Sequence, residues 1–222
     1  MMASFEVQPG DERITTAMLS DSLDECGLRS QVLERRLAPV VAGARAFGRA
    51  ATARFVPTEP DEPDESHDPY RAAIDFIGGL ERGELVVIAT GESDASAFWG
   101  ELFSAAAIGA GVVGVVTDGN LRDTERIAAL RFPAFSRSRR PIDYRRRMTM
   151  VESRDTVTIG GVRIADGDLV MADDDGVVII PREREVEVLA VARQRASKES
   201  TVLAELLAGE SLRAVWDRHR IL

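Results

Sequence analysis

Arg122 and Asp123 are the residues whose types and spacing best suit chemistry. They close the segment Gly114-Val-Val-Thr-Asp-Gly-Asn-Leu-Arg-Asp123. Arginine presents a planar set of donors that can grip a carboxylate or a 2-oxo oxygen at two points. The neighbouring carboxylate can hold a divalent cation, because hard cations prefer oxygen ligands. The pair therefore predicts an anionic substrate bound beside a metal ion.

A second candidate group, Gly100-Glu101-Leu102-Phe103, opens an apolar helical segment upstream. The first N–H groups of a helix are unpaired and partly positive, so they suit a carboxylate. Glycine leaves room for a ligand, and a carboxylate in an apolar stretch favours a polar cavity there. A structural interpretation stays open for both groups, since an Arg-Asp pair often serves as a cap with a surface ion pair.

The elements that must position these residues alternate between strands and helices, which predicts an α/β layer with parallel pairing. Ligands collect beyond the carboxyl ends of parallel strands, so the loops 91–100 and 118–123 should converge there. The expected helices are 12–29, 71–80, 97–108 and 123–130, and the expected strands are 40–56, 83–90, 111–117 and 132–135, with turns over 91–96 and 118–121.

The second half of the chain is predicted to be richer in strands. We expect a hairpin over 156–164 around Gly160-Gly161, strands over 169–172 and 177–180, a long helix over 182–208 and a short one over 210–220. No linker separates these parts, so residues 1–222 are interpreted as one domain. The acidic, proline-containing segment 58–70 is predicted to be a surface loop whose role the sequence does not define.

Composition narrows the chemistry. The net charge of −9 argues against a nucleic-acid partner, and no apolar run is long enough to span a membrane. There is no secretory signal and only one cysteine, Cys26, so a reducing cytoplasm is the expected location. Two histidines and one cysteine make a His/Cys zinc site improbable, and the sole lysine, Lys198, lies in a polar stretch unsuited to a Schiff base. Carboxylate-bound Mg²⁺ or Mn²⁺ is the better expectation.

The segment GELFSAAAIGAGVVGVVTDGNLRD resembles the signature of the class II 4-hydroxy-4-methyl-2-oxoglutarate aldolase family, which also contains the regulator of ribonuclease activity A. That signature joins a Gly-Asp-x-Leu segment to a Gly-x-x-Arg-Asp turn, matched here by residues 100–103 and 119–123. SDSLDECG (20–27) and GDLVMADDDGVVIIP (167–181) resemble the family's N-terminal helix and second strand pair. The resemblance covers residues 14–200.

The resemblance implies a swivelling β/β/α domain of the α/β class, with a central mixed sheet and flanking helices. It implies a trimer or a pair of trimers, with the C-terminal helices over 182–222 at the subunit interface. The resemblance also implies roles for individual residues. The substrate carboxylate would bind the backbone N–H groups of Gly100, Glu101, Leu102 and Phe103, and Arg122 would contact the pyruvyl group. Asp123 would bind Mg²⁺ or Mn²⁺, and Glu101, with Glu199 of a neighbouring subunit, would hold the metal-bound waters.

The implied activity is that of a metal-dependent carbon–carbon lyase, which cleaves a 4-hydroxy-2-oxo acid or oxaloacetate to pyruvate through a metal-stabilised enolate. Departures from the family pattern put the substrate in question: Glu101 replaces the usual aspartate, and Phe103 and Trp99 make the pocket wall bulkier. The acidic loop over 58–70 also fits the family poorly. The alternative is a non-catalytic regulator that binds an RNA-degrading enzyme with the same fold. The sequence leaves open the substrate, the choice between catalysis and regulation, and trimer against hexamer.

Overall fold

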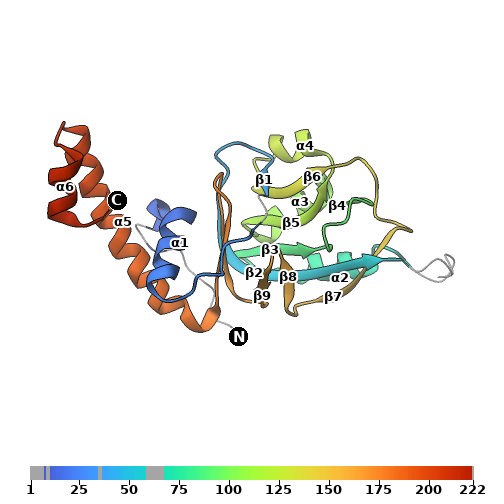
Figure 1. Ribbon diagram of the computed structural model, residues 1–222. Coiled ribbons are helices and arrows are strands. Elements are labelled where there is room, and N and C mark those ends of the chain that lie inside the picture. The colour runs from blue at the N-terminus through green and yellow to red at the C-terminus, as the bar shows by residue number, and fades with distance from the viewer. Residues whose placement is uncertain (1–7, 9–10, 35–36, 59–67, 222) are drawn as a thin grey trace.

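The computed structural model describes residue 8 and residues 11–34, 37–58 and 68–221. Most of the predicted acidic loop, with His67, lies outside these ranges. Within them, nine strands form one sheet of order β1-β6-β5-β3-β2-β10-β11, with β4 beside β5 and β7 beside β2 (Figure 1). These strands are β1 (Ala38–Pro39), β2 (Ala46–Pro57), β3 (Glu84–Ala89), β4 (Ala97–Trp99), β5 (Gly114–Leu121), β6 (Ala134–Arg139), β7 (Met148–Ser153), β10 (Leu169–Ala172) and β11 (Val177–Ile180).

The centre of the sheet is parallel and its flank is antiparallel. β2, β3, β5 and β6 run parallel, whereas β10 pairs antiparallel with both β2 and β11. β3 reads Glu-Leu-Val-Val-Ile-Ala and is buried from Leu85 onward, as expected for a parallel strand covered on both faces. The predicted α/β class with a central mixed sheet and flanking helices is therefore confirmed.

Each face of the sheet is covered by different elements. The helices are α1 (Thr16–Glu25), α2 (Arg71–Gly78), α3 (Glu101–Ala110), α4 (Thr124–Ala129), α5 (Glu185–Leu207) and α6 (Leu212–His219), with single turns at Asp11–Arg13 and Arg182–Arg184. Side chains of α2, α3 and α4 pack on one face against Val86, Ile88 and Val115. The predicted hairpin, β8 (Val157–Ile159) with β9 (Val162–Ile164), is confirmed and packs on the other face.

A third core joins the ends of the chain. Apolar residues of α1 and of the first half of α5 pack against β10 and β11, around Leu19, Met171 and Val188. α5 then continues away from the sheet, and α6 folds back against the end of α5 (Figure 1). None of the helices in the described ranges has the length and apolar character needed to span a membrane.

The predicted turn over 118–121 was wrong, because these residues complete β5. Asp-Gly-Asn is a typical turn sequence. Here the strand continues because Asn120 and Leu121 pair with β4 and β6. Gly119 allows the Phe98 ring to pack against the strand, since a Cβ at this position would lie 2.6 Å from that ring. Asp118 and Asn120 are buried, and both bond to the loop that follows β3.

The predicted helix over 97–108 was wrong at its start. Residues 97–99 form β4, since Ala97 and Trp99 pair with Asn120 and Leu121 of β5. The helix begins at Glu101 and runs to Ala110, further than expected. The strand expected over 40–56 likewise begins only at Ala46, and β7 was not predicted. These differences place Gly100 at a junction between a strand and a helix, with the Arg122–Asp123 pair beside it.

Candidate functional site

A cavity of about 460 Å³ opens where α3 begins and β5 ends. Its size lies within the range of small-molecule sites, about 300–1,000 Å³. The lining combines a few polar groups with many apolar ones: Asp68, Tyr70, Ile74, Phe98, Trp99, Gly100, Leu102, Phe103, Arg122, Asp123 and Tyr144. The structure thus brings together five of the predicted site residues, namely Gly100, Leu102, Phe103, Arg122 and Asp123.

The start of α3 is shaped for an anion. Gly100 is its N-cap and provides no side-chain cap, so the opening N–H groups lack an intrahelical partner. One of them, Glu101 N–H, lies 3.4 Å from Asp123 Oδ2. A Cβ at Gly100 would stand 2.7 Å from that same oxygen and 3.2 Å from Arg122 Cγ. Glycine is therefore required for the close approach of the two segments, while the N–H groups of Leu102 and Phe103 stay available to a ligand.

Asp123 adopts a conformation that aims its carboxylate away from its own helix. Its φ of 55° lies in the left-handed region, which non-glycine residues adopt at a cost. It is the N-cap residue of α4, yet its side chain makes no capping hydrogen bond there. The carboxylate turns instead to the start of α3 and lies 3.7 Å from Arg122 Nε. This partly exposed carboxylate is free to accept a cation.

Arg122 is held between two carboxylates. Its backbone N–H donates to the Trp99 carbonyl at 3.0 Å, which fixes the end of β5 against β4. Its Nη1 donates to Asp143 Oδ2 at 2.8 Å. The guanidinium still lines the cavity, and donors beyond these two contacts can reach a substrate oxygen.

Asp143 was not singled out from the sequence, although it is the organising carboxylate of this region. It accepts hydrogen bonds from Tyr70 Oη at 2.8 Å and from the Arg145 backbone N–H at 2.9 Å, besides that from Arg122. Burial alone would raise the pKa of Asp143, but these hydrogen bonds outweigh it and hold the pKa below its ordinary value. The sequence did offer one signal for its importance, since Asp143 is the single acidic residue in the arginine-rich stretch RSRRPIDYRRR. We call Gly100, Arg122, Asp123 and Asp143 the pocket cluster.

The remaining predicted residues lie elsewhere. The Glu101 side chain is half-buried and is not part of the cavity lining, and no described residue pairs with its carboxylate. Glu199 lies on α5, where it pairs with Arg195 at 3.5 Å, and does not line the cavity of its own chain. Asp173 lies between β10 and β11 and accepts hydrogen bonds from the first residue of α1, Thr16.

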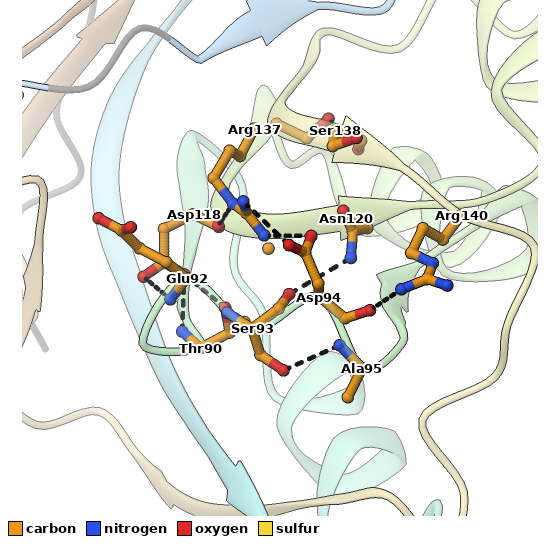
Figure 2. Close-up of polar contacts among 12 residues, drawn as sticks. Thr90, Glu92, Ser93, Asp94, Ala95, Asp118, Asn120, Arg137, Ser138 and Arg140 are labelled. Carbon is orange, nitrogen blue, oxygen red and sulfur yellow. Dashed lines mark hydrogen bonds and ion pairs between the residues drawn. The ribbon is translucent and has the colours of Figure 1, made fainter.

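The loop over 91–96 forms a separate, closed network (Figure 2). Asp118 accepts hydrogen bonds from Thr90 N–H at 2.7 Å, Thr90 Oγ1 at 2.8 Å and Glu92 N–H at 3.0 Å. Arg137 donates to the Asp118 carbonyl and pairs with Asp94. Burial raises the pKa of Asp118 despite these bonds. We call these five residues the loop cluster. The two segments expected to converge, 91–100 and 118–123, therefore lie together, as predicted. None of the loop cluster lines the cavity, to which this loop contributes residues 98–100.

The donors present fit a hard cation that keeps most of its water. Within the described ranges, no group of three or more His, Cys, Asp or Glu side chains could enclose a metal ion. Mg²⁺ is commonly held by one or two carboxylates together with water and substrate oxygens. Asp123 supplies one such carboxylate at the cavity, and Glu101 is the first residue of α3, directly after Gly100. A cation held by Asp123 fits this arrangement, whereas a zinc-type cage does not.

Fold and pocket together define an α/β protein with an uncapped helix start, an arginine and a carboxylate at the carboxyl edge of its sheet. The chain belongs to the RraA-like family, whose model, described as "Aldolase/RraA", matches residues 16–179. This confirms the family suggested by the 100–123 signature. The fold is also that of RraAS2 from Streptomyces coelicolor, described as an unusual member of the RNase ES inhibitor RraA protein family, at a TM-score of 0.75 and 25% identity over 85% of this chain and 91% of that one.

The relatives found by sequence carry different names. Protein DlpA of Legionella pneumophila is 26% identical over 89% of this chain, and the chain spans only 31% of that relative's length. The "Putative 4-hydroxy-4-methyl-2-oxoglutarate aldolase" of Burkholderia multivorans is 31% identical over 67% of this chain and 84% of its own. Two further relatives carry the same aldolase name, at 32% and 31% identity. The family thus joins proteins named as aldolases with others named as inhibitors.

Proposed function

We propose that this protein is a divalent-metal-dependent carbon–carbon lyase, which cleaves a 4-hydroxy-2-oxo acid or oxaloacetate to pyruvate. The observation that carries the proposal is the convergence of three groups on one cavity: the uncapped start of α3, the Arg122 guanidinium and the Asp123 carboxylate. The aldolase names of three relatives support the same class of reaction.

Each group has a role that follows from its charge. The N–H groups of Leu102 and Phe103 receive the substrate carboxylate. Arg122 lies beside the 2-oxo oxygen, where negative charge grows as the C3–C4 bond breaks and its electron pair passes to C3. Asp123, with Glu101 nearby, would hold Mg²⁺ or Mn²⁺. The chemistry supplied by that cation, when bound, is polarisation of the 2-oxo group.

Two proton transfers complete the reaction. The C4 hydroxyl loses its proton as C4 becomes a carbonyl, and C3 of the enolate gains one to give pyruvate. We assign the first transfer to Glu101, acting through water, because no described residue pairs with its carboxylate. Glu199 of a neighbouring subunit is proposed as a second carboxylate near the same water.

One assay tests the proposal. Purified protein is incubated with Mg²⁺ or Mn²⁺ and either oxaloacetate or 4-hydroxy-4-methyl-2-oxoglutarate, and pyruvate is followed over time. We expect release that stops in excess chelator and returns with metal. Lys198→Arg is the matched control and should leave turnover unchanged. Full activity in chelator would overturn the metal-dependent mechanism, and loss of activity in Lys198→Arg would favour a Schiff base.

An inert protein would favour the second function, that of a regulator that binds an RNA-degrading enzyme. The likeness to the Streptomyces coelicolor inhibitor-family protein supports that alternative.

The lyase proposal also includes assembly into trimers or hexamers, because a neighbour's carboxylate would complete the site. Exposed leucines on the projecting helices, Leu203, Leu207 and Leu212, suit such contacts. A solution mass showing only monomer would contradict the assembly.

A further inference from the structure

We call the part of a substrate that carries the carboxylate and the 2-oxo group its head group, which is assigned to the start of α3 and to Arg122. Apart from the residues that would bind this head group, the cavity is lined mainly by apolar and aromatic side chains. We call this part the apolar chamber and define it by Tyr70, Ile74, Phe98, Phe103 and Tyr144. These residues come from the start of α2, from α2 itself, from β4, from α3 and from the segment after β6. Gly100, Arg122 and Asp123 of the pocket cluster line the same cavity, so a ligand held at Arg122 would extend into the chamber.

The aromatic walls of the chamber are fixed in place. Tyr144 packs edge-on against Phe55 at 5.1 Å and against Tyr70 at 5.4 Å, measured between ring centroids. Phe55 in turn packs edge-on against Phe98 at 5.1 Å. The Tyr70 hydroxyl donates to Asp143, which ties this wall to Arg122. Such packed rings form a rigid surface that can bind an apolar group at little cost in ordering.

The charges that face the cavity do not suit a second carboxylate. Of the charged residues described in the lining, which are Asp68, Arg122 and Asp123, the last is assigned to the divalent cation, which leaves Asp68 and Arg122 to face the rest of a ligand. Arg122, the sole cationic side chain among the described residues of the lining, already contacts two carboxylates and is assigned to the head group. A second carboxylate would therefore lose its water against apolar rings and beside Asp68, which is unfavourable.

We infer that the protein acts on 2-oxo acids that carry one carboxylate and an uncharged, apolar tail; this inference rests on the proposed function for the head group. The cavity of about 460 Å³ is large enough for both parts, since a cavity of about 150 Å³ already holds a benzene molecule. A suitable substrate is 4-hydroxy-2-oxo-4-phenylbutanoate. Its C3–C4 bond breaks, the C4 hydroxyl proton is lost, and the products are benzaldehyde and pyruvate.

The kinetic test compares this compound with the dicarboxylate 4-hydroxy-4-methyl-2-oxoglutarate at saturating Mg²⁺ or Mn²⁺. We expect kcat/KM to be higher for the phenyl compound by at least about tenfold, the scale that one apolar contact commonly contributes to selectivity. Ile74→Arg should reverse the preference, because it places a cation at the chamber rim, where Ile74 is 54% exposed and tolerates a longer side chain. Ile108→Arg is the matched control: Ile108 is 43% exposed on α3 but does not line the cavity, so its selectivity should equal that of the wild type.

A binding measurement separates failure of the chamber from failure of the proposed function. Phenylpyruvate and 2-oxoglutarate are titrated into the metal-loaded protein by calorimetry, and phenylpyruvate should bind more tightly by about tenfold or more. If neither hydroxy acid yields pyruvate but phenylpyruvate still binds preferentially, the chamber stands and the lyase assignment fails. If pyruvate is released faster from the dicarboxylate, or Ile74→Arg behaves like Ile108→Arg, the apolar-tail inference is overturned while the lyase assignment stands.

Discussion

Two polar clusters lie at the carboxyl edge of the same sheet, and they differ in how far their hydrogen-bonding groups are used. In the loop cluster, Asp118 is buried and accepts three hydrogen bonds, while Arg137 ties the loop to β6. In the pocket cluster, Asp123 has a left-handed backbone and a partly exposed carboxylate whose contacts to Glu101 N–H and Arg122 Nε are long, at 3.4 and 3.7 Å. A satisfied network stabilises the fold, whereas groups left with unused capacity are available to a ligand.

The largest effect is expected from the pocket cluster. Asp123→Asn removes the charge that would hold a hard cation while it keeps one oxygen, so pyruvate release should fall by about 10²–10³-fold, as for loss of a group that acts on the transition state. High Mn²⁺ should restore part of it. The measurement is initial rate against metal concentration. Near-normal rates at every concentration would place the cation elsewhere.

Arg122→Lys should have the next largest effect. Lysine keeps the positive charge but loses the planar, two-point contact, so both kcat and KM should suffer, by about tenfold or more in kcat/KM. Added metal should not rescue this variant, because Arg122 is assigned to substrate and not to the cation. Rescue by Mn²⁺ to the extent seen for Asp123→Asn would show that the two residues share one role.

Substitutions in the loop cluster should lower the stability of the protein and leave its catalytic rate unchanged. Asp118→Ala leaves Thr90 and Glu92 without their acceptor in a buried position, so the free energy of unfolding should fall by about 2–4 kcal/mol. Turnover per folded molecule should stay close to that of the wild type. Asp94→Ala is the control, because its side chain is 65% exposed and its ion pair should contribute less than about 1 kcal/mol. Urea unfolding followed by circular dichroism gives both values, and a variant that unfolds normally but loses activity would contradict this division.

The smallest effect is expected in how the stability of the fold depends on pH through Asp143. Its pKa is lowered in the folded state, so the ionised form favours folding and its contribution is present at neutral pH. That contribution is lost as the pH falls through the lowered pKa, below about 4. The stability difference between wild type and Asp143→Asn should therefore stay constant from pH 6 to about pH 4.5 and shrink as the pH falls below about 4 in urea titrations. A difference that grows with acidification would mean that the folded state favours the protonated acid.

The fold and the pocket differ in how well the sequence predicted them. Unbroken apolar runs such as Leu85–Ala89 identified the buried strands, and the Gly160-Gly161 turn identified the hairpin. Errors came where tertiary contacts override local preference: β5 continues through 118–121 because it pairs there with β4 and β6, and Gly119 lets the Phe98 ring pack against the strand. Within the site, Arg122 and Asp123 were predictable from type and spacing. Asp143 was not, because its role depends on a contact with Tyr70 from a distant part of the chain.

The position of β2 has a consequence for synthesis on the ribosome. This strand pairs with β3, which follows soon after it, but also with β7 and β10, and the last of these emerges roughly a hundred residues later. At about 5–20 residues per second, one edge of β2 waits on the order of ten seconds for its partner. During that interval an apolar strand edge is open to pairing with another nascent chain. Newly made protein should therefore be most prone to aggregation before β10 has emerged, and slower translation between β7 and β10 should lower its soluble yield.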